Sequence, residues 1–209
     1  MGKPAVFIRL ALCNLRCDWC DTSYTWKWPV KESSKHVLSI PPEEVARIIS
    51  DFPTRHIVIT GGEPLIQSGK IIELLKYLPF HTLEVETNGT LIPPEELDCR
   101  VTQYNISPKH SHSGNSDRNA LSVQALEWFA ASSKAWFKFV IESPGDIEEV
   151  EKLEKSIPLP HDRILLMPKG TTSEELNRIL PWLAEECLKR GYRLTDRLHI
   201  HLWGNKPGV

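Results

Sequence analysis

Hydrophobic residues follow two alternating patterns along the chain. Short apolar, β-branched runs predict β-strands, and the amphipathic stretches between them predict α-helices. The first expected helix begins with prolines and acids, and the last ends in Lys-Arg-Gly at 189–191, as helix termini commonly do. Pro181 lies inside that last helix and is expected to kink it or split it in two. The expected strands are 5–10, 55–60, 82–87, 101–107, 136–142, 163–167 and 197–203, and the expected helices are 41–52, 69–78, 117–130, 145–155 and 171–191.

This alternation of strand and helix implies parallel strands joined by crossover helices. Six or seven strands are too few for a closed eight-stranded barrel, and 209 residues fall short of the ~250 typical of one. We therefore predict an α/β fold, an open, partial (β/α)6-type barrel, in a single domain over residues 1–209. The polar segment 107–119 is expected to form a long loop after the fourth strand, where such folds place ligand contacts.

Charge and composition limit the kinds of partner and the compartment that we expect for this protein. A net charge of −2 and the lack of a basic block argue against nucleic acid as a partner. The sequence has no apolar run of ~18 residues, so it predicts no membrane span. The five cysteines are an odd number, and the start shows no export signal, so we expect a reducing compartment, the cytoplasm. Two of them, Cys99 and Cys187, lie far from the others and are expected to be partly buried structural thiols.

The other three cysteines, Cys13, Cys17 and Cys20, lie within eight residues, with the spacing C-x3-C-x2-C directly after the first expected strand. A structural zinc ion takes four protein ligands, but no second cysteine pair follows and the first histidine is His36. Thiolates also hold [4Fe–4S] clusters, ordinarily four of them. Three thiolates leave one iron free to chelate S-adenosylmethionine, whose cleavage by a cluster electron yields a hydrogen-abstracting radical. We favour this cluster over two alternatives, a zinc site and cysteines that are merely buried.

The triplet resembles the hallmark of the radical S-adenosylmethionine superfamily, in which an aromatic residue, here Trp19, precedes the last cysteine. A second segment agrees, because "ITGGEP" (59–64) follows the second expected strand, where the superfamily has a similar Gly-Gly-Glu-Pro segment. Small residues there let the backbone approach the amino group of the methionine moiety, which gives Gly62 a role in binding the cosubstrate.

Nearly the whole chain also resembles one family, the 7-carboxy-7-deazaguanine synthases of queuosine biosynthesis, a tRNA-modification pathway. The resemblance is carried by "GKPAVFIRLALCNLRCDWCDTSYTW", "VITGGEPLIQ", "LEVETNGT", "NISPKHS" and "LHIHLWGNKPGV". It implies a carbon–nitrogen lyase that contracts 6-carboxy-5,6,7,8-tetrahydropterin to 7-carboxy-7-deazaguanine and releases ammonia. It also implies a bound Mg²⁺, a homodimer and an electron donor such as flavodoxin.

The same resemblance assigns site residues by position. Cys13, Cys17 and Cys20 would hold the cluster, and Thr22 would ligate Mg²⁺ through its hydroxyl, an oxygen ligand that a hard cation accepts. The alternative for Thr22 is a residue that caps a turn. The residues assigned to S-adenosylmethionine are Trp19, Cys20, Asp21, Gly62, Ser107, Pro108, Lys109, Met167, Pro168, Lys169 and Gly170, and those assigned to the substrate are Arg9, Thr60 and the C-terminal carboxylate of Val209.

Two further expectations concern the barrel mouth and the start of the chain. Glu86 and Asn88 are expected to point into the mouth, where a buried Glu needs a partner. The family usually has a substrate-binding Gln-Gly-Glu-Gly-like segment on an upstream strand, which this sequence lacks, so we expect a truncated start or a different way of holding the substrate. Two other functions stay open: an activating enzyme of glycyl-radical proteins, and a zinc- or cluster-binding interaction module.

Overall fold

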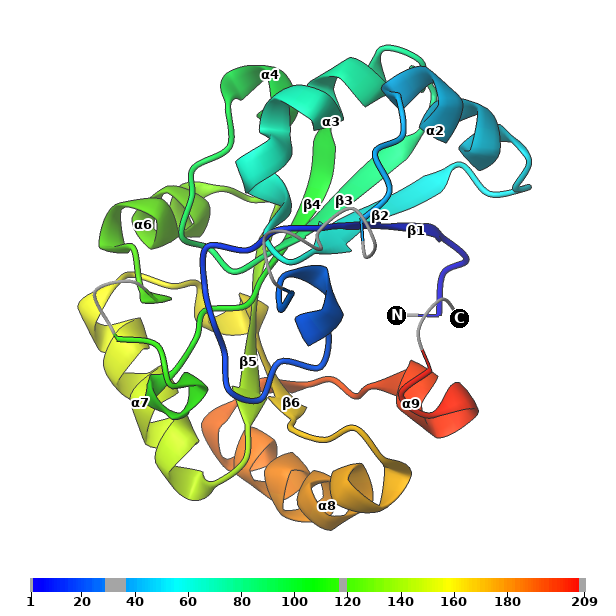
Figure 1. The fold of residues 1–209 in the computed structure, drawn as a ribbon. Coiled ribbons are helices and arrows are strands. Elements are labelled where there is room, and N and C mark those ends of the chain that lie inside the picture. Colours follow the sequence, from blue (N-terminus) through cyan, green and yellow to red (C-terminus); the bar gives the residue numbers. More distant parts are fainter. Residues whose placement is uncertain (1, 29–36, 117–119, 207–209) are drawn as a thin grey trace.

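Seven parallel strands form a single sheet in the computed structural model, which describes residues 2–28, 37–116 and 120–206. The strands lie side by side in the order of the sequence, so every crossover runs the same way and the sheet curls into an open, partial barrel (Figure 1). The prediction of a parallel, open α/β barrel is confirmed. The strands are β1 (Val6–Leu10), β2 (His56–Gly61), β3 (Thr82–Thr87), β4 (Val101–Ile106), β5 (Ala135–Ile141), β6 (Ile164–Pro168) and β7 (Arg193–Leu194).

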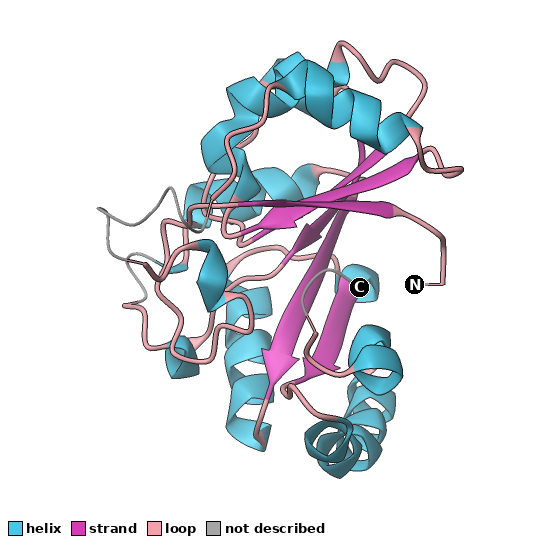
Figure 2. Cartoon of the chain, turned by 45° about the vertical axis from the view of Figure 1, so that its right-hand side comes forward, coloured by secondary structure: helices cyan, strands magenta, loops and turns pink. Residues whose placement is uncertain are grey.

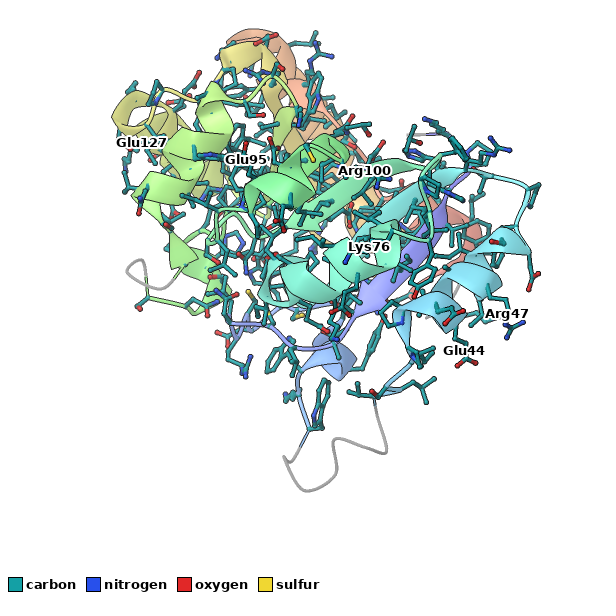
Figure 3. The ribbon with its side chains drawn as sticks, turned by 90° about the horizontal axis from the view of Figure 1, so that it is seen from above. Glu44, Arg47, Lys76, Glu95, Arg100 and Glu127 are labelled. Atoms are coloured by element: carbon teal, nitrogen blue, oxygen red, sulfur yellow. The ribbon has the colours of Figure 1, made fainter. Side chains whose placement is uncertain are left out.

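Helices surround the outer side of this curved sheet (Figures 1 and 2). Charged residues such as Glu44 and Arg47 on α2, and Glu127 on α6, point away from the strands (Figure 3). No helix within the three described stretches is long and apolar enough to cross a membrane. The α-helices are α2 (Pro42–Ser50), α3 (Ser68–Leu75), α4 (Glu95–Asp98), α6 (Val123–Ala131), α7 (Pro144–Ser156), α8 (Ser173–Arg190) and α9 (Leu198–Trp203), and the 3₁₀-helices are η1 (Ser23–Thr25), η3 (Pro64–Gln67), η4 (Ser111–Ser113) and η5 (His161–Arg163).

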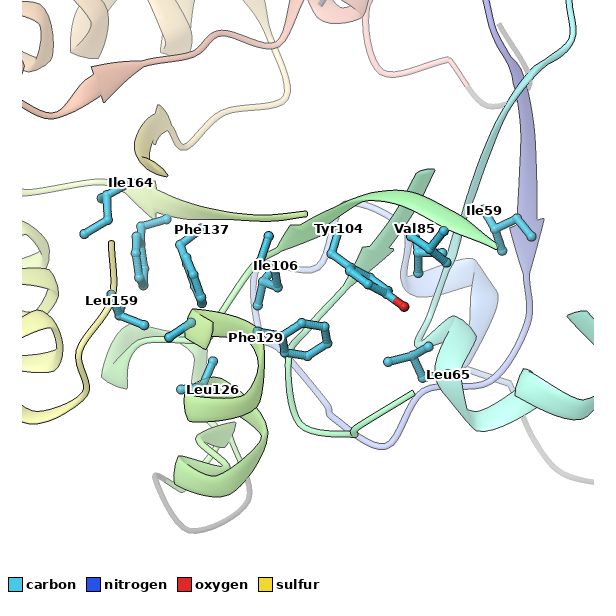
Figure 4. Close-up of a cluster of buried hydrophobic side chains, with 14 of the residues drawn as sticks. Ile59, Leu65, Val85, Tyr104, Ile106, Leu126, Phe129, Phe137, Leu159 and Ile164 are labelled. Carbon is cyan, nitrogen blue, oxygen red and sulfur yellow. The ribbon is translucent and has the colours of Figure 1, made fainter. Parts of the chain in front are cut away.

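The core lies between the sheet and these helices. In β3 the buried residues Leu83 and Val85 alternate with Glu84 and Glu86, so successive side chains point to opposite faces. Figure 4 shows the apolar face, where strand side chains pack against helix residues such as Phe129 of α6. The opposite face carries, beside apolar residues such as Val58 and Val140, most of the polar side chains of the strands: Arg9, Thr60, Glu84, Glu86, Gln103, Asn105 and Lys138. The sheet thus separates a dry outer layer from a polar interior.

The longest helix, α8, begins and ends on signals that its sequence carries. The Thr172 hydroxyl accepts from the backbone N–H of Glu175, 3.2 Å away, and the Glu175 carboxylate accepts from Thr172 N–H in return. Gly191 ends the helix in a left-handed conformation, with φ of 75°. The helix runs without interruption through Pro181, so of the two expected outcomes, a kink or a split, the split in two is wrong. Buried Leu176, Ile179, Leu183 and Cys187 hold the helix against the barrel on both sides of the proline.

The segment 197–203 was expected to be a strand and is instead helix α9. Its apolar residues alternate over only a few positions, a pattern too short to separate strand from helix. Only Ile200 is buried among them, while Leu198 and Leu202 are exposed, and the short β7 at Arg193–Leu194 already ends the sheet. The Asp196 carboxylate pairs with His201 Nε2 at 3.0 Å, which favours a local turn of helix.

Cys187 is buried on α8, as expected, but Cys99 is exposed, so the expectation of a partly buried thiol is wrong there. Cys99 follows the short helix α4, which the sequence pattern did not predict, and its thiol donates to the Glu96 carbonyl at 3.2 Å. The exposed side of that turn leaves the thiol in solvent.

Replacing Pro181 with Ala is expected to raise the free energy of unfolding by about 2 kcal/mol. A proline inside a helix costs ~3 kcal/mol relative to Ala, and the more flexible unfolded chain of the variant offsets part of the gain. Pro181 is exposed, so packing should not change. Urea unfolding would measure this. Pro144→Ala is the matched control, because Pro144 stands at the first position of α7, where proline costs little. A neutral or destabilising Pro181→Ala would contradict the expectation.

Candidate functional site

The three clustered cysteines lie on the loop that leaves the carboxyl end of β1. Leu12 fixes the start of this loop: its N–H donates to Thr25 O at 2.9 Å, its carbonyl accepts from Glu63 N–H at 2.8 Å, and its φ is 74°. Cys13, Cys17 and Cys20 are half-buried free thiols. Burial raises the pKa of Cys13 and of Cys17 above the usual thiol value, although the nearby Lys109 ammonium acts in the opposite direction. Burial therefore favours the protonated thiols over free thiolates at these two positions.

The arrangement fits a cluster better than a single ion. Within the described stretches no three His, Cys, Asp or Glu side chains converge on one position that could hold a metal ion. A [4Fe–4S] cluster binds each thiolate at a different iron, so its ligands need not converge. Each of the three cysteine sulfurs also lies within hydrogen-bonding distance of one N–H group, which suits an anionic metal-bound thiolate.

At the end of β2, Gly61 packs against the end of β1 and Gly62 packs against the cysteine loop. A Cβ on Gly61 would overlap the Leu10 carbonyl oxygen, and one on Gly62 would overlap the Leu12 carbonyl oxygen. Gly61 also has φ of 149°, which disfavours other residues. The two glycines are therefore needed so that the backbone after β2 can lie close to the backbone at Leu10 and Leu12. This need is independent of any role of Gly62 in cosubstrate binding.

Lys109 reaches the cysteine loop from the segment after β4. Its ammonium donates to the Ser107 hydroxyl at 2.8 Å and lies 5.5 Å from the centre of the Trp19 ring. Burial lowers the pKa of Lys109, while the thiols of Cys17 and Cys13 favour its charged form. The structure thus brings together the predicted residues Trp19, Ser107 and Lys109, with Pro108 buried between the last two. A cation with few protein partners beside the cysteines suits a ligand carboxylate.

A second group of charges occupies the polar face of the sheet. The Glu86 carboxylate accepts from Thr60 Oγ1 at 3.0 Å and pairs with Lys138 Nζ at 3.4 Å. Lys138 is the main reason that the pKa of Glu86 is held below its usual range, and Arg9 acts in the same direction. Arg9 stands opposite Thr60 in the β1–β2 register. The expectation that Glu86 has a partner is confirmed, and the predicted substrate residues Arg9 and Thr60 meet around it.

Helix α9 closes part of this polar region. Arg197, just before the helix, forms an ion pair with Asp21 of the cysteine loop. Burial acts to raise the pKa of Asp21, but Arg197, with Lys109 and Arg9, holds it below its usual range. Burial lowers the pKa of His199, and so does Arg197. Sequence reasoning gave no role to Arg197 or His199, because it treated the segment as a strand.

Thr22 does not use its hydroxyl to cap the turn that it begins. Its carbonyl accepts from Thr25 N–H at 2.9 Å, but its side chain makes no capping hydrogen bond to η1. The hydroxyl instead lies 3.7 Å from the Cys20 sulfur. The capping alternative is therefore not supported for the side chain, and the oxygen faces the site.

The predicted residues Lys169 and Gly170 contact neighbouring strand and helix residues rather than the cysteine loop. Lys169, just after β6, pairs with Glu142, just after β5, at 2.6 Å. Gly170 packs under Leu176 of α8, where a Cβ would come within 2.9 Å of Leu176 Cδ2. These residues, with Met167 and Pro168, lie at the carboxyl end of β6, the same edge of the sheet. Val209 lies outside the described residues.

Comparison with known proteins decides the family. The model of the Radical SAM superfamily matches residues 8–113. The 7-carboxy-7-deazaguanine synthase of Pyrobaculum aerophilum is 38% identical over 210 residues, covering all of this chain and 90% of the relative. The chain belongs to the 7-carboxy-7-deazaguanine synthase family. The enzyme of that name from Rhodopirellula baltica is 31% identical over 223 residues, covering all of this chain and 82% of the relative.

Solved structures agree with this family. The crystal structure of QueE from Escherichia coli superposes with a TM-score of 0.66 and 27% identity, covering 94% of this chain and 86% of the other. The structure of Streptococcus suis SuiB bound to S-adenosylmethionine has a TM-score of 0.61 at 14% identity and covers 92% of this chain and 50% of that one, so it shows the shared fold alone.

Glu63, which belongs to the "GGEP" segment but was given no role of its own, is fully buried beneath the cysteine loop. Its carboxylate accepts from the N–H of Leu65 at 3.0 Å, the hydroxyl of Thr87 at 2.8 Å and the N–H of Asn88 at 2.7 Å. Burial raises its pKa in spite of these donors. The Asn88 side chain in turn donates to Asn14 Oδ1 at 2.9 Å, so Asn88 faces the cysteine loop. The sequence offers only a general signal for Glu63: an acidic residue that becomes buried needs hydrogen-bond donors around it.

Replacing Glu63 with Ala is expected to destabilise the protein by about 3 kcal/mol. Three buried donors lose their acceptor, and each unsatisfied group costs ~1–3 kcal/mol, partly offset because a buried carboxylate is removed. Urea unfolding would measure the loss, with Glu148→Ala on the exposed face of α7 as the control. Equal midpoints for the two variants would contradict the anchoring role of Glu63.

Proposed function

We propose that this chain converts 6-carboxy-5,6,7,8-tetrahydropterin to 7-carboxy-7-deazaguanine by a radical ring contraction that releases ammonia, in queuosine biosynthesis. The observation that carries the proposal is whole-chain identity of 38% to a synthase of that name, with the cysteine triplet set at the mouth of a polar barrel. This favours the synthase over a glycyl-radical activating enzyme and over a zinc- or cluster-binding interaction module.

The residues at the barrel mouth fit the cofactors of this reaction. Cys13, Cys17 and Cys20 would hold a [4Fe–4S] cluster, and Lys109 and Ser107 would bind the cosubstrate carboxylate. When bound, the cluster supplies the electron that cleaves S-adenosylmethionine and so generates the radical that abstracts hydrogen. The indole N–H of Trp19 is buried without a protein partner in the described chain and is a further donor at this position.

The polar face of the sheet fits the pterin. Arg9 and Lys138 are cations beside Glu86, and a guanidinium binds a carboxylate with two parallel hydrogen bonds. The substrate carries one carboxylate and a heterocycle with both donors and acceptors, which Thr60 and Glu86 can meet. Binding between these groups would place the pterin next to the cysteine loop and hold it away from bulk water.

The proposal includes Mg²⁺, a homodimer and a cytoplasmic location. Mg²⁺ would bind the Thr22 hydroxyl, because oxygen ligands suit a hard cation and this hydroxyl makes no capping hydrogen bond to the turn. An external electron donor such as flavodoxin would reduce the cluster. The C-terminal carboxylate and the segment 167–170 are proposed to approach the substrate and the cosubstrate respectively.

Anaerobic reconstitution is expected to load about four iron and four sulfide per chain and to give turnover of the carboxy-tetrahydropterin to 7-carboxy-7-deazaguanine, detected by mass. Cys17→Ala should abolish both cluster and product. Cys99→Ala is the matched control, because that exposed thiol lies outside the site. Full activity on a partner protein, with no product from the pterin, would favour the activating enzyme instead, and stoichiometric zinc without iron would favour the interaction module.

Thr22→Val is expected to lower turnover about tenfold or more while the cluster stays in place, because a methyl group cannot ligate Mg²⁺. Turnover would be measured over a range of Mg²⁺ concentrations. Thr22→Ser keeps the hydroxyl and should retain most of the activity. If Thr22→Val matches the unchanged protein at every concentration, Thr22 is not a ligand.

A further inference from the structure

Each of the three cysteine sulfurs accepts one N–H, and each N–H comes from a different source. Cys13 Sγ accepts from the backbone of Leu15 at 3.4 Å. Cys17 Sγ accepts from the side-chain amide of Asn115 at 3.3 Å, and Cys20 Sγ accepts from the indole of Trp26 at 3.4 Å. The family hallmark specifies the cysteines and their spacing, but it does not specify the two side-chain donors.

The Asn115 amide has only one orientation that satisfies its neighbours. The backbone N–H of Arg16 lies 2.9 Å from one end of the amide, so that end must be the carbonyl oxygen. The NH₂ group is then directed to Cys17, and it also lies 3.3 Å from the Ser113 hydroxyl. The donor is therefore held toward the sulfur by contacts that do not involve the sulfur.

The loop that carries Asn115 is fastened on both sides. On one side, Asp18 N–H donates to Ser113 O at 3.0 Å, and Gly114, with φ of 77°, packs against the Asp18 side chain. On the other side, His112 Nδ1 pairs with Asp146 of α7 at 2.6 Å. The loop therefore spans from the cysteines to the start of α7 and holds the amide at a fixed position.

Trp26 is positioned in a comparable way. The Arg16 guanidinium lies 4.7 Å from the centre of its ring, a cation–π contact that holds the indole beside the cysteine loop. The indole nitrogen can only donate, so its hydrogen bond to Cys20 Sγ has a single sense. Arg16 thus supports both donors, through its backbone for Asn115 and through its side chain for Trp26.

We propose that Asn115 and Trp26 set the reduction potential of the cluster by donating hydrogen bonds to the sulfurs of Cys17 and Cys20. Reduction adds negative charge to the iron–thiolate unit, and N–H dipoles directed at the sulfurs stabilise the more negative state. Both donors therefore raise the potential, which makes the cluster easier to reduce by a given electron donor. The inference rests on the cluster of the family and not on the pterin proposed above.

The test measures the midpoint potential of the reconstituted, cluster-loaded protein by anaerobic spectroelectrochemistry, without substrate or S-adenosylmethionine. Asn115→Leu removes the amide donor and keeps the same branching of the side chain, and Trp26→Phe removes the indole N–H but keeps an aromatic ring for Arg16. Each variant is expected to lower the ratio of reduced to oxidised cluster about tenfold at a fixed applied potential, which is ~59 mV for one electron. The double variant should be shifted further than either. Reduced-cluster electron paramagnetic resonance at that potential gives a second readout.

Asn177→Leu on the exposed face of α8 and Trp203→Phe on α9 are matched controls and should keep the original potential. Loaded Asn115→Leu and Trp26→Phe that both titrate at the original potential would overturn the proposal. If Asn115→Leu takes up no cluster, Trp26→Phe decides alone, and failure of both to load would show that these residues only hold the thiolates, which also overturns it. Since no pterin is present, none of these outcomes depends on the proposed reaction.

Discussion

The buried carboxylate of Glu63 is the interaction on which the mouth of the barrel depends. It stands at the end of β2 and accepts hydrogen bonds from Thr87 and Asn88 at the end of β3, so it joins the two strands where they leave the sheet. Its backbone N–H donates to Leu12 O, which joins both strands to the cysteine loop. A fully buried carboxylate is stable only when hydrogen-bond donors surround its oxygens. Here those donors lie at the ends of the elements that the carboxylate holds together.

The sheet divides the molecule into two chemical environments. Its outer face is covered by helices and filled with aliphatic and aromatic side chains, which supply the hydrophobic stabilisation. Its inner face carries Glu86, which pairs with Lys138 and is also influenced by the charge of Arg9. The main apolar cluster lies on the outer side, so the inner side can carry these charged groups, beside a few buried apolar residues such as Val58 and Val140.

Charge at the cysteine loop is arranged around the thiols. Lys109 lies close enough to influence Cys17, Asn115 and Trp26 donate N–H groups to the sulfurs of Cys17 and Cys20, and Asp21 forms an ion pair with Arg197. Buried thiols alone resist ionisation, as the raised pKa values of Cys13 and Cys17 indicate. Once iron binds the thiolates, the hydrogen bond to each sulfur adjusts how much negative charge the cluster accepts.

The sequence by itself determined the features that depend on neighbouring residues. The alternation of strands and helices, the cysteine triplet, and the small residues of "GGEP" are local patterns, because periodicity and ligand spacing act over a few positions. The structure places Trp19 beside Lys109, which the family resemblance had assigned to one site, and gives Glu86 the partner that it was expected to need, Thr60.

Only the tertiary structure decided the contacts that cross the chain. Asn115 reaches Cys17 across 98 residues and Arg197 reaches Asp21 across 176, and no local pattern fixes where two loops meet. The conformation of α9 also depends on the tertiary structure. Its six residues of alternating polarity fit either a strand or a helix, and the sheet already ends at β7, so they form a helix. Pro181 stayed inside one helix because packing on both sides of it outweighed a local cost of ~3 kcal/mol, a balance that is set by the whole fold.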